Sequence, residues 1–277
     1  MARPLRIEFP GALYHITARG NERRPIFYGD DDYALLLRLL GDVIERHCWV
    51  CHSYCLMPNH HHLMIETPEP NLSRGMRQLN GVYAQTFNKL HGRTGHLFGG
   101  RFKSILVERE PYLLNLCGYI ARNPLRWRPP LAPLEEYRWS SYLALAGRTP
   151  APPWLTTVWV LRQFARRRRD AERLYADFVH EHVDDDPWRE LKGDLYLGSD
   201  AFAHAHSIND DLEHEIPLAH KQPARRTLTE IFAAEGERAI LVAHLDHGYR
   251  LHEIAALCGV HYSTVSRRLK HLLALNA

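Results

Sequence analysis

The sequence predicts an α+β fold, in which helices cover a ferredoxin-like antiparallel sheet, followed by an all-α C-terminal domain. Three observations predict it. Strand and helix patterns follow each other as βαββαβα through the first 150 residues. Two of those strands are joined by the tight turn at Pro58-Asn59, and strands joined by so tight a turn pair antiparallel. After about Pro223 the pattern is helical alone.

The first predicted strand is residues 12–19, ALYHITAR, where side chains alternate with the two-residue period of a sheet. A helix follows from about Asp31 to His47, because an acidic cluster opens it and apolar residues then recur at helical spacing. The segments WVCHSYCLM and HHLMIET, residues 49–57 and 61–67, are the two strands of the hairpin.

The second half of the predicted domain adds two helices, a loop and one strand. A helix begins at residues 71–73 and reaches about Leu90, and the glycine-rich segment HGRTGHLFGGR is a loop. FKSILVE, residues 102–108, is a further strand. The helix PYLLNLCGYIARN has Pro111 in its first turn and ends before Pro124.

Two boundaries divide the chain into residues 1–149, 150–222 and 223–277. The proline-rich segment RTPAPPWL follows Gly147, and the region 150–222 is predicted to be a helical and irregular linker. Its arginine run at residues 166–169 contacts phosphate or is merely a solvated helix face, and the sequence leaves both open.

The last domain has the spacing of a helix-turn-helix. A helix from Leu251 to Cys258 ends at Gly259, and a second helix, capped by Ser263, runs to Leu273. The expected core is Ile254, Ala255, Val260, Val265 and Leu269. The second helix presents side chains suited to base edges and phosphates of duplex DNA, namely His261, Tyr262, Ser263, Thr264, Ser266, Arg267 and Arg268. The alternative is a plain three-helix bundle.

Composition narrows the class of protein. A hydrophobic fraction of 45% and a charged fraction of 24% predict a packed, soluble protein. No apolar stretch approaches the roughly 20 residues that cross a bilayer, and MARPLRIEFPG lacks a signal-peptide pattern, so we expect no membrane partner and a cytoplasmic location. The five scattered cysteines lack the second pair of a zinc site. The net charge of +3 permits nucleic-acid binding without indicating it.

The segment MPNHHHLMIE holds the first candidate site. Side chains alternate along a strand, so His60 and His62 share one face while His61 points to the other. Two imidazoles on one face can hold one cation, although such a pair is a weak signal alone. His204 and His206 have the same spacing in a segment without a convincing partner.

The helix before Pro124 supports the prediction of a metal site at His60 and His62. Tyr119 and Asn123 are four residues apart and therefore share a helical face, where a phenol and a carboxamide are unusual core side chains. They suit a metal-assisted attack on phosphate, with the tyrosine oxygen as nucleophile. With Asn123 as third ligand, two imidazoles and an amide leave positions open and suit Mg²⁺ or Mn²⁺.

Several motifs resemble the REP-associated tyrosine transposases of the HUH single-tyrosine transposase superfamily. They are PGALYHITARGN, CLMPNHHHLMIETP, GHLFGGRFKSILVE, YIARNPLR and WSSY, in order between about Ile7 and Gly147. LHEIAALCGVHYSTVSRRLK is separately similar to the helix-turn-helix tail of longer members. The resemblance implies a ferredoxin-like HUH fold. It also implies cleavage of single-stranded DNA, often at hairpin-bearing repeats, through a 5′-phosphotyrosine that leaves a free 3′-hydroxyl.

Residue by residue, His60 and His62 match the family's metal pair, Tyr119 its nucleophile and Asn123 the neighbouring ligand. His61 departs from the family, which has a bulky hydrophobe there. Since it faces away from the pair, we expect consequences for packing or tautomer rather than loss of the site.

Other residues complete the prediction. Tyr83 is the rival nucleophile, although its helical spacing favours the core or stacking on DNA. A set that flanks the site is expected to line a channel for single-stranded DNA: Arg19, Asn21, Arg23, Arg24, Arg101 and Lys103, with Phe102 stacking on a base.

The sequence therefore predicts a metal-dependent single-stranded DNA endonuclease and strand transferase that acts at repeat or hairpin DNA. Its expected partners are that DNA at the catalytic domain and duplex DNA at the tail, and it is a monomer or a homodimer. The alternatives are a DNA-binding regulator with an inactive transposase domain and an RNA-binding protein that uses the sheet.

Overall fold

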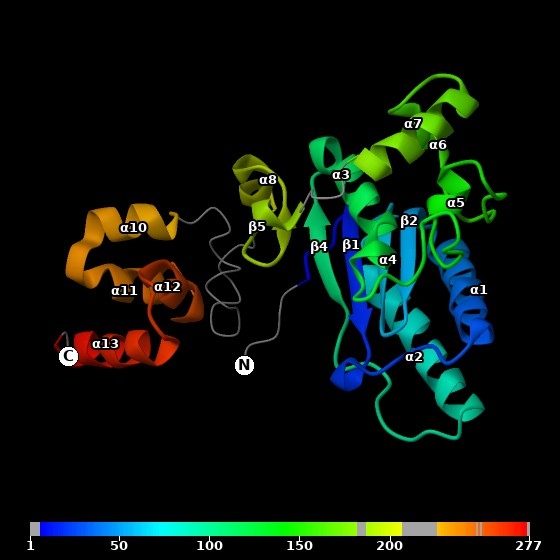
Figure 1. Cartoon of the computed structure of the whole chain (residues 1–277). Coiled ribbons are helices and arrows are strands. Elements are labelled where there is room, and N and C mark those ends of the chain that lie inside the picture. Colours follow the sequence, from blue (N-terminus) through cyan, green and yellow to red (C-terminus); the bar gives the residue numbers. More distant parts are fainter. Residues whose placement is uncertain (1–5, 182–186, 207–225, 248, 250, 276–277) are drawn as a thin grey trace. The chain divides into compact units, whose positions relative to one another are not determined.

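The computed structural model describes residues 6–181, 187–206, 226–247, 249 and 251–275. The chain forms two compact units (Figure 1). The first is Glu8–Glu190, and the second combines Met1–Ile7 with Leu191–Ala277. The region 150–222 thus contributes to both units, and each has a buried core of its own.

The first unit is built on four antiparallel strands in the order β2-β3-β1-β4. The strands are β1 (Ala12–Arg19), β2 (Val50–Met57), β3 (His60–Thr67) and β4 (Lys103–Val107). Each falls within one or two residues of its predicted bounds. The connections pass through α1 (Asp30–His47), α2 (Leu72–Leu90) and then, after β4, α3 (Arg109–Ala121). The predicted ferredoxin-like arrangement is confirmed.

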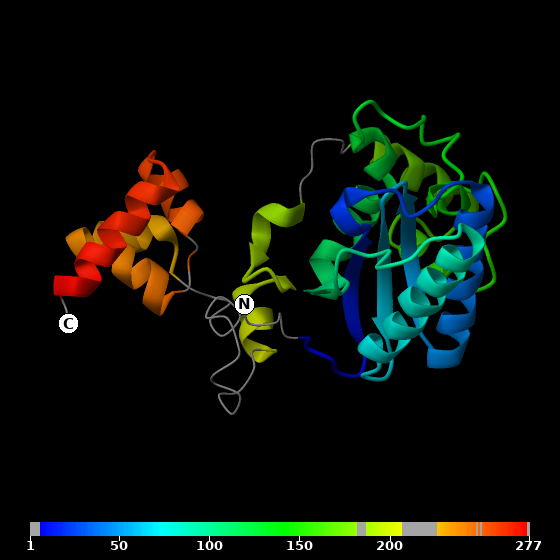
Figure 2. The ribbon, with the colours of Figure 1, turned by 90° about the horizontal axis from the view of Figure 1, so that it is seen from below.

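Helices cover both faces of this sheet (Figure 2). On one face α1 and α2 pack against each other, and on the other α3 packs against β2 and β3. The negative charges of the aspartates in the first turn of α1 stabilise the positive end of the helix dipole. Asp32 also accepts a hydrogen bond from the backbone N–H of Tyr28 at 2.7 Å. Gly75 in α2 is required because a Cβ there would lie 2.1 Å from the indole of Trp49.

The outer edge of β2 is covered by the segment that contains WSSY. The N–H of Leu56 donates to the carbonyl of Trp139 at 2.9 Å, and the N–H of Ser141 donates to the carbonyl of Tyr54 at 2.9 Å. Farther on, the N–H of Thr156 donates to the carbonyl of Cys51 at 2.8 Å. These bonds satisfy backbone groups that an open edge would leave unpaired.

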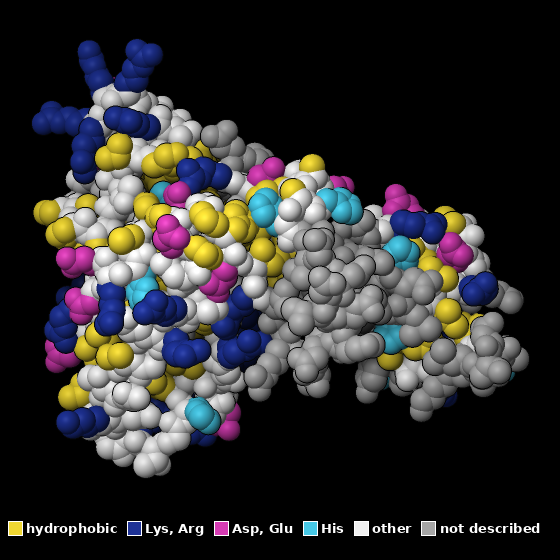
Figure 3. Space-filling view, turned by 180° about the vertical axis from the view of Figure 1, so that it is seen from behind, with side chains coloured by type: hydrophobic (Ala, Val, Ile, Leu, Met, Phe, Trp, Pro, Cys, Tyr) yellow, Lys and Arg dark blue, Asp and Glu magenta, His cyan; other side chains and the backbone are white. Residues whose placement is uncertain are grey.

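The chain after this segment stays in the first unit. It forms α5 (Tyr142–Leu145), α6 (Val158–Arg162), α7 (Arg168–Glu181) and the 3₁₀ turn η2 (Pro187–Glu190). Ala171, Tyr175 and Val179 recur every four residues on α7 and are buried. Seen from behind, Lys and Arg side chains gather at the upper left, over the end formed by α6 and α7 (Figure 3).

The second unit begins with a short hairpin and a helix: β5 (Leu191–Lys192), β6 (Tyr196–Leu197) and α8 (Asp200–Ala205). Its other elements are α10 (Leu228–Glu235), η4 (Gly236–Arg238), α11 (Ala239–Leu241), η5 (Val242–Asp246), α12 (Leu251–Cys258) and α13 (Tyr262–Leu275). No helix in the described part of the chain is long and apolar enough to span a membrane.

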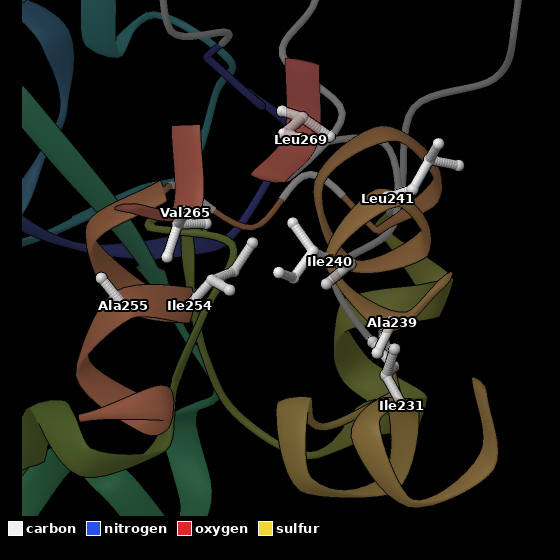
Figure 4. Packing of buried hydrophobic residues seen from close by; sticks show 9 residues of the cluster. Ile231, Ala239, Ile240, Leu241, Ile254, Ala255, Val265 and Leu269 are labelled. Atoms are coloured by element: carbon white, nitrogen blue, oxygen red, sulfur yellow. The ribbon is translucent and has the colours of Figure 1, made fainter. Parts of the chain in front are cut away.

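The helix-turn-helix core of this unit is confirmed. Ile254, Ala255, Val265 and Leu269 are buried and Val260 is partly buried, and Ile254 lies between Val265 and Ile240 (Figure 4). Gly259 ends α12 with a left-handed φ of 64°. The prediction that Ser263 caps the second helix is wrong, since α13 begins at Tyr262 and Ser263 lies in its first turn.

Candidate active site on the histidine face of the sheet

One face of the sheet carries three imidazoles. Antiparallel register pairs His60 with Arg19 and His62 with Thr17, so these side chains share a face. His15, two residues before Thr17 on β1, also lies on it, and His15 Nε2 is 2.9 Å from His62 Nδ1. We call the sheet surface that carries His15, His60 and His62 the histidine face.

The phenol of Tyr119 reaches this face from α3. Its ring centroid lies 6.0 Å from that of His62 and 6.4 Å from that of His15, and both contacts are edge-on. The rings of His60 and His62 are 4.9 Å apart. The structure therefore brings together the imidazole pair and the phenol that the sequence placed on separate elements.

Asn123 begins the short helix α4 (Asn123–Arg126) and is almost fully buried. Its amide nitrogen donates to the carbonyls of Tyr119 at 3.0 Å and Ile120 at 3.4 Å. Only the NH₂ group can face two carbonyls, so Oδ1 points away from them. This oxygen is the atom of Asn123 that can accept a ligand.

The tautomer of His60 follows from its neighbour Asn59. The amide nitrogen of Asn59 donates to the carbonyl of Arg23 at 2.8 Å, which turns Asn59 Oδ1 toward the imidazole. His60 Nδ1 lies 2.7 Å from that oxygen and must be the donor. Its other nitrogen, Nε2, therefore carries the lone pair.

His15 can fix the tautomer of His62 in the same way. When His62 Nδ1 donates to His15 Nε2, the lone pair of His62 is at Nε2, and His15 carries its own proton on Nδ1. His62 Nε2 is buried and has no hydrogen-bond partner within the described residues. A metal-binding histidine needs this arrangement, in which the second nitrogen donates to a neighbour.

Burial keeps all three imidazoles neutral. It lowers the pKa of His15 to about 3 and that of His60 to about 4, and the nearby charges of His60 and Arg19, respectively, lower them further. Burial also holds the pKa of His62 well below its usual range, with His15 and His60 adding to the shift. Neutral imidazole is the form that binds a cation, so the face is ready for one at neutral pH.

Two more side chains enclose the phenol ring. Trp188, from η2, lies 5.1 Å from the ring of Tyr119 and 4.8 Å from that of His15. The guanidinium of Arg126 lies 4.7 Å from the centre of the Tyr119 ring. No local sequence pattern singles out Trp188, Arg126 or His15 as members of the site.

The rival nucleophile Tyr83 lies in the core. Its hydroxyl donates to the carbonyl of Ile26 at 2.5 Å, and burial raises its pKa far above the ordinary value. Its ring packs with Phe27, Phe87 and Phe98. Phe98 also packs on His61, whose side chain points away from the histidine face. A phenol so placed cannot meet DNA.

Two known protein families match separate parts of the chain. Residues 9–123 match the family described as IS200-like transposases. These residues form an IS200-like transposase domain. The match contains His15, His60, His62 and Tyr119, and it ends at Asn123. Residues 233–274 match the homeodomain-like family, in agreement with the helix-turn-helix core.

Solved structures also resemble the chain. One is a REP-associated tyrosine transposase bound to a REP hairpin, which is 17% identical with a TM-score of 0.46 and covers 56% of this chain and 92% of its own. Another, a protein from Deinococcus radiodurans assigned as a transposase, is 18% identical with a TM-score of 0.32 and covers 43% and 95%. No curated protein matches this sequence.

The residues predicted to line a channel for single-stranded DNA, which we call the basic set, gather at one end of the sheet in the transposase domain. The N–H of Gly20 donates to the carbonyl of Asn59 at 2.8 Å, and the N–H of Gly99 donates to the carbonyl of Arg19 at 2.9 Å. Gly20 is required because a Cβ there would lie 2.1 Å from the carbonyl oxygen of Arg24. These bonds bring exposed residues close to His60, namely Arg19, Asn21, Arg23, Arg24 and Arg101.

Residues 102 and 103 differ in what they can offer to DNA. Lys103 pairs with Thr17, so it is on the histidine face, and it is exposed. Phe102 is only 9% exposed. The predicted stacking of Phe102 on a base would therefore require this ring to turn out of the core.

The homeodomain-like domain exposes part of its predicted surface. His261, Arg267 and Arg268 are exposed, and Thr264 and Ser266 are half-buried. The side chains of Tyr262 and Ser263 lie outside the described part of the chain.

The second histidine pair has a different geometry from the first. His204 is in α8 and His206 follows its end, and residues two apart on a helix point about 200° apart. His206 Nδ1 contacts the carbonyl of Phe202 at 2.9 Å. Across the described ranges no three His, Cys, Asp or Glu side chains converge on a metal position. A cation on His60 and His62 thus needs oxygen ligands such as Asn123.

Proposed function

We propose that this chain is a metal-dependent single-stranded DNA endonuclease and strand transferase that acts at repeat or hairpin DNA through a 5′-phosphotyrosine. One observation supports this most strongly. Within an IS200-like transposase domain, the phenol of Tyr119 lies 6.0 Å from the ring of His62, whose buried Nε2 has no partner in the described residues.

The chemistry assigned to Tyr119 is a transesterification. Its oxygen attacks the scissile phosphorus, and the bond from phosphorus to the 3′ oxygen breaks. The strand on one side leaves with a 3′-hydroxyl, and the other remains attached to Tyr119 through its 5′-phosphate. The phosphodiester energy is kept in the new bond, so a second 3′-hydroxyl can reverse the step without ATP.

The donor set fits a divalent cation such as Mg²⁺ or Mn²⁺. His60 Nε2, His62 Nε2 and Asn123 Oδ1 would hold it, and open positions would remain for phosphate oxygens. When bound, the cation would polarise a phosphoryl oxygen of the scissile phosphate. The chain's own part is to present neutral imidazoles with fixed tautomers.

Two surfaces would bind the DNA. The exposed basic set at the end of the sheet would follow the phosphates of the single strand toward His60. In the homeodomain-like domain α13 would contact duplex DNA through Thr264, Ser266, Arg267 and Arg268.

The test is a covalent adduct between protein and DNA. Incubation with Mn²⁺ and a hairpin-bearing single strand labelled at its 3′ end should give a labelled protein band under denaturing conditions. A label at the 5′ end should instead leave on a free fragment, and chelation with EDTA should prevent both products. Adducts that carry the 5′ label would contradict the proposed polarity.

The second candidate is a DNA-binding regulator with an inactive transposase domain. The homeodomain-like match and the exposed Arg267 and Arg268 favour it. It would replace the first proposal if no strand derived from the repeats near the gene gave an adduct while the protein bound duplex DNA tightly.

His15 provides a prediction about the metal. His15→Phe keeps an aromatic ring but removes the acceptor for His62 Nδ1, so the affinity for Mn²⁺ should fall by about 10- to 100-fold. Electron paramagnetic resonance of free Mn²⁺ measures this without any reaction. His15→Gln offers an amide oxygen and should restore part of the affinity, whereas equal affinity in His15→Phe and the native protein would show that His15 does not position His62.

A further inference from the structure

A cluster of arginines lies away from the histidine face, where α6 ends and α7 begins. All its members are exposed, and we call them the α7 arginine cluster: Arg162, Arg166, Arg167, Arg168 and Arg169. Basic side chains project from this end of the unit in Figure 3. The chemistry proposed for Tyr119 does not use them.

Acidic side chains of α7 offset only part of this charge, and Asp170 is the one acidic residue in its first turn. Arg168 pairs with Glu172 at 2.7 Å. In the part of the chain that the structure describes, the side chains of Arg162, Arg166, Arg167 and Arg169 have no ion pair or hydrogen bond. The cluster also surrounds the N-terminus of α7, whose macrodipole repels cations. Such an arrangement works against the helix and is relieved by an anionic partner.

We propose that the α7 arginine cluster binds the phosphates of a DNA duplex stem adjoining the strand that Tyr119 cuts; this rests on the proposed function. The cluster is anchored to the site by α7. Arg122, in the turn after Tyr119, donates to the carbonyl of Val179 at 3.2 Å. From Val179 back to Arg169 the helix rises about 15 Å, or about four to five base pairs of DNA.

The side chains fit a duplex better than a single strand. Proteins that bind single strands pair basic groups with aromatic faces on which bases stack. Phe164, the aromatic residue between Arg162 and Arg166, instead packs against Tyr175 and Phe178 at 5.8 Å and 5.5 Å. A guanidinium that contacts phosphate reads no base, and a stem presents phosphates whatever its sequence.

The test compares two variants of the full chain that each lose three positive charges. Arg166→Gln/Arg167→Gln/Arg169→Gln removes three arginines of the cluster whose side chains have no ion pair in the described residues. The matched control, Arg38→Gln/Arg46→Gln/Arg77→Gln, changes exposed arginines of α1 and α2 on the other side of the sheet. Fluorescence anisotropy measures binding of a hairpin with a ten-base-pair stem and a single-stranded tail, and of the tail alone, over a range of salt concentrations.

The cluster variant should bind the hairpin about tenfold more weakly or worse, and the slope of log K against log salt should shrink by about three. Binding to the tail alone should not change, and the control should bind both probes like the native protein. The melting temperature of the cluster variant should be unchanged or higher, because repulsion at α7 is removed. A lower melting temperature together with weaker hairpin binding would assign the arginines a structural role and overturn the proposal.

Two other outcomes would also overturn it. If the cluster variant bound the hairpin with the affinity and salt dependence of the native protein, the stem would not be the partner of the cluster. Loss of binding to vesicles of phosphatidylserine and phosphatidylcholine, with hairpin binding intact, would assign the cluster to a membrane surface. Failure of the nuclease proposal looks different: stem binding would still depend on the cluster, but no adduct would form on any strand.

Discussion

Replacing Tyr119 with phenylalanine is expected to abolish the covalent adduct, with a loss of at least about a thousandfold in the rate of strand cleavage. The change removes only the phenolic oxygen. The ring can keep its edge contacts with His62 and Trp188 and its place beside Arg126. Since no hydrogen bond of the Tyr119 hydroxyl is present among the described residues, the fold should lose little stability.

Tyr83→Phe is the matched control, because it deletes the same atom from a buried tyrosine on the other face of the sheet. It breaks the hydrogen bond to Ile26 and should cost about 1 to 2 kcal/mol of stability, yet it should leave adduct formation intact. Denaturing gels and mass spectrometry of the peptide that carries the DNA measure both variants. An adduct that survives Tyr119→Phe but is lost with Tyr83→Phe would reverse the assignment.

Local sequence patterns predict those residues of the site that lie together on one strand or one helix. Alternation along one strand separates His60 and His62 from His61, and the four-residue spacing puts Tyr119 and Asn123 on one helical face. The two-residue turn before His60 leaves only antiparallel pairing. These relations depend on residues close in the chain, so they can be predicted without the tertiary structure.

Contacts between distant segments were beyond such patterns. His15 meets His62 only because the register of β1 on β3 aligns residues 47 positions apart, and neither strand alone determines that register. Trp188 comes from a polar segment without clear periodicity. Phe102 was assigned by its basic neighbours, although adjacent residues of a strand face opposite ways.

One apolar pattern in the sequence predicts the packing of α7. Ala171, Tyr175 and Val179 form an apolar stripe on a helix whose other side is charged, which is the signature of a helix packed on a core. The sequence instead placed this helix in a linker region and left its arginine run open between phosphate contact and a solvated face. In the structure both features hold at once, since α7 buries the stripe and exposes the arginines.

His61→Leu is expected to raise the free energy of unfolding by about 1 to 3 kcal/mol at pH 7. The imidazole of His61 is fully buried, and neither ring nitrogen has a hydrogen-bond partner in the described residues. Leucine fills a similar volume and needs no partner. Because His61 points away from the histidine face, adduct formation should be unaffected, and urea unfolding measures the stability gain.

The gain should grow as the pH falls. Burial, aided by the charge of His60, lowers the pKa of His61 from 6.5 to about 3. Between these values the unfolded chain binds a proton that the folded chain does not, so each unit of falling pH removes about 1.4 kcal/mol of stability for this one group. Leucine binds no proton in either state, so this loss of stability does not occur in the variant.

At pH 5 the advantage of His61→Leu should therefore exceed its value at pH 7 by about 2 kcal/mol. Both proteins still lose stability in acid through His15, His60 and His62, whose pKa values are lowered too. The difference between the two unfolding curves isolates His61. If that difference is the same at both pH values, the imidazole of His61 is solvated or hydrogen-bonded in the folded protein, and its burial without a partner is refuted.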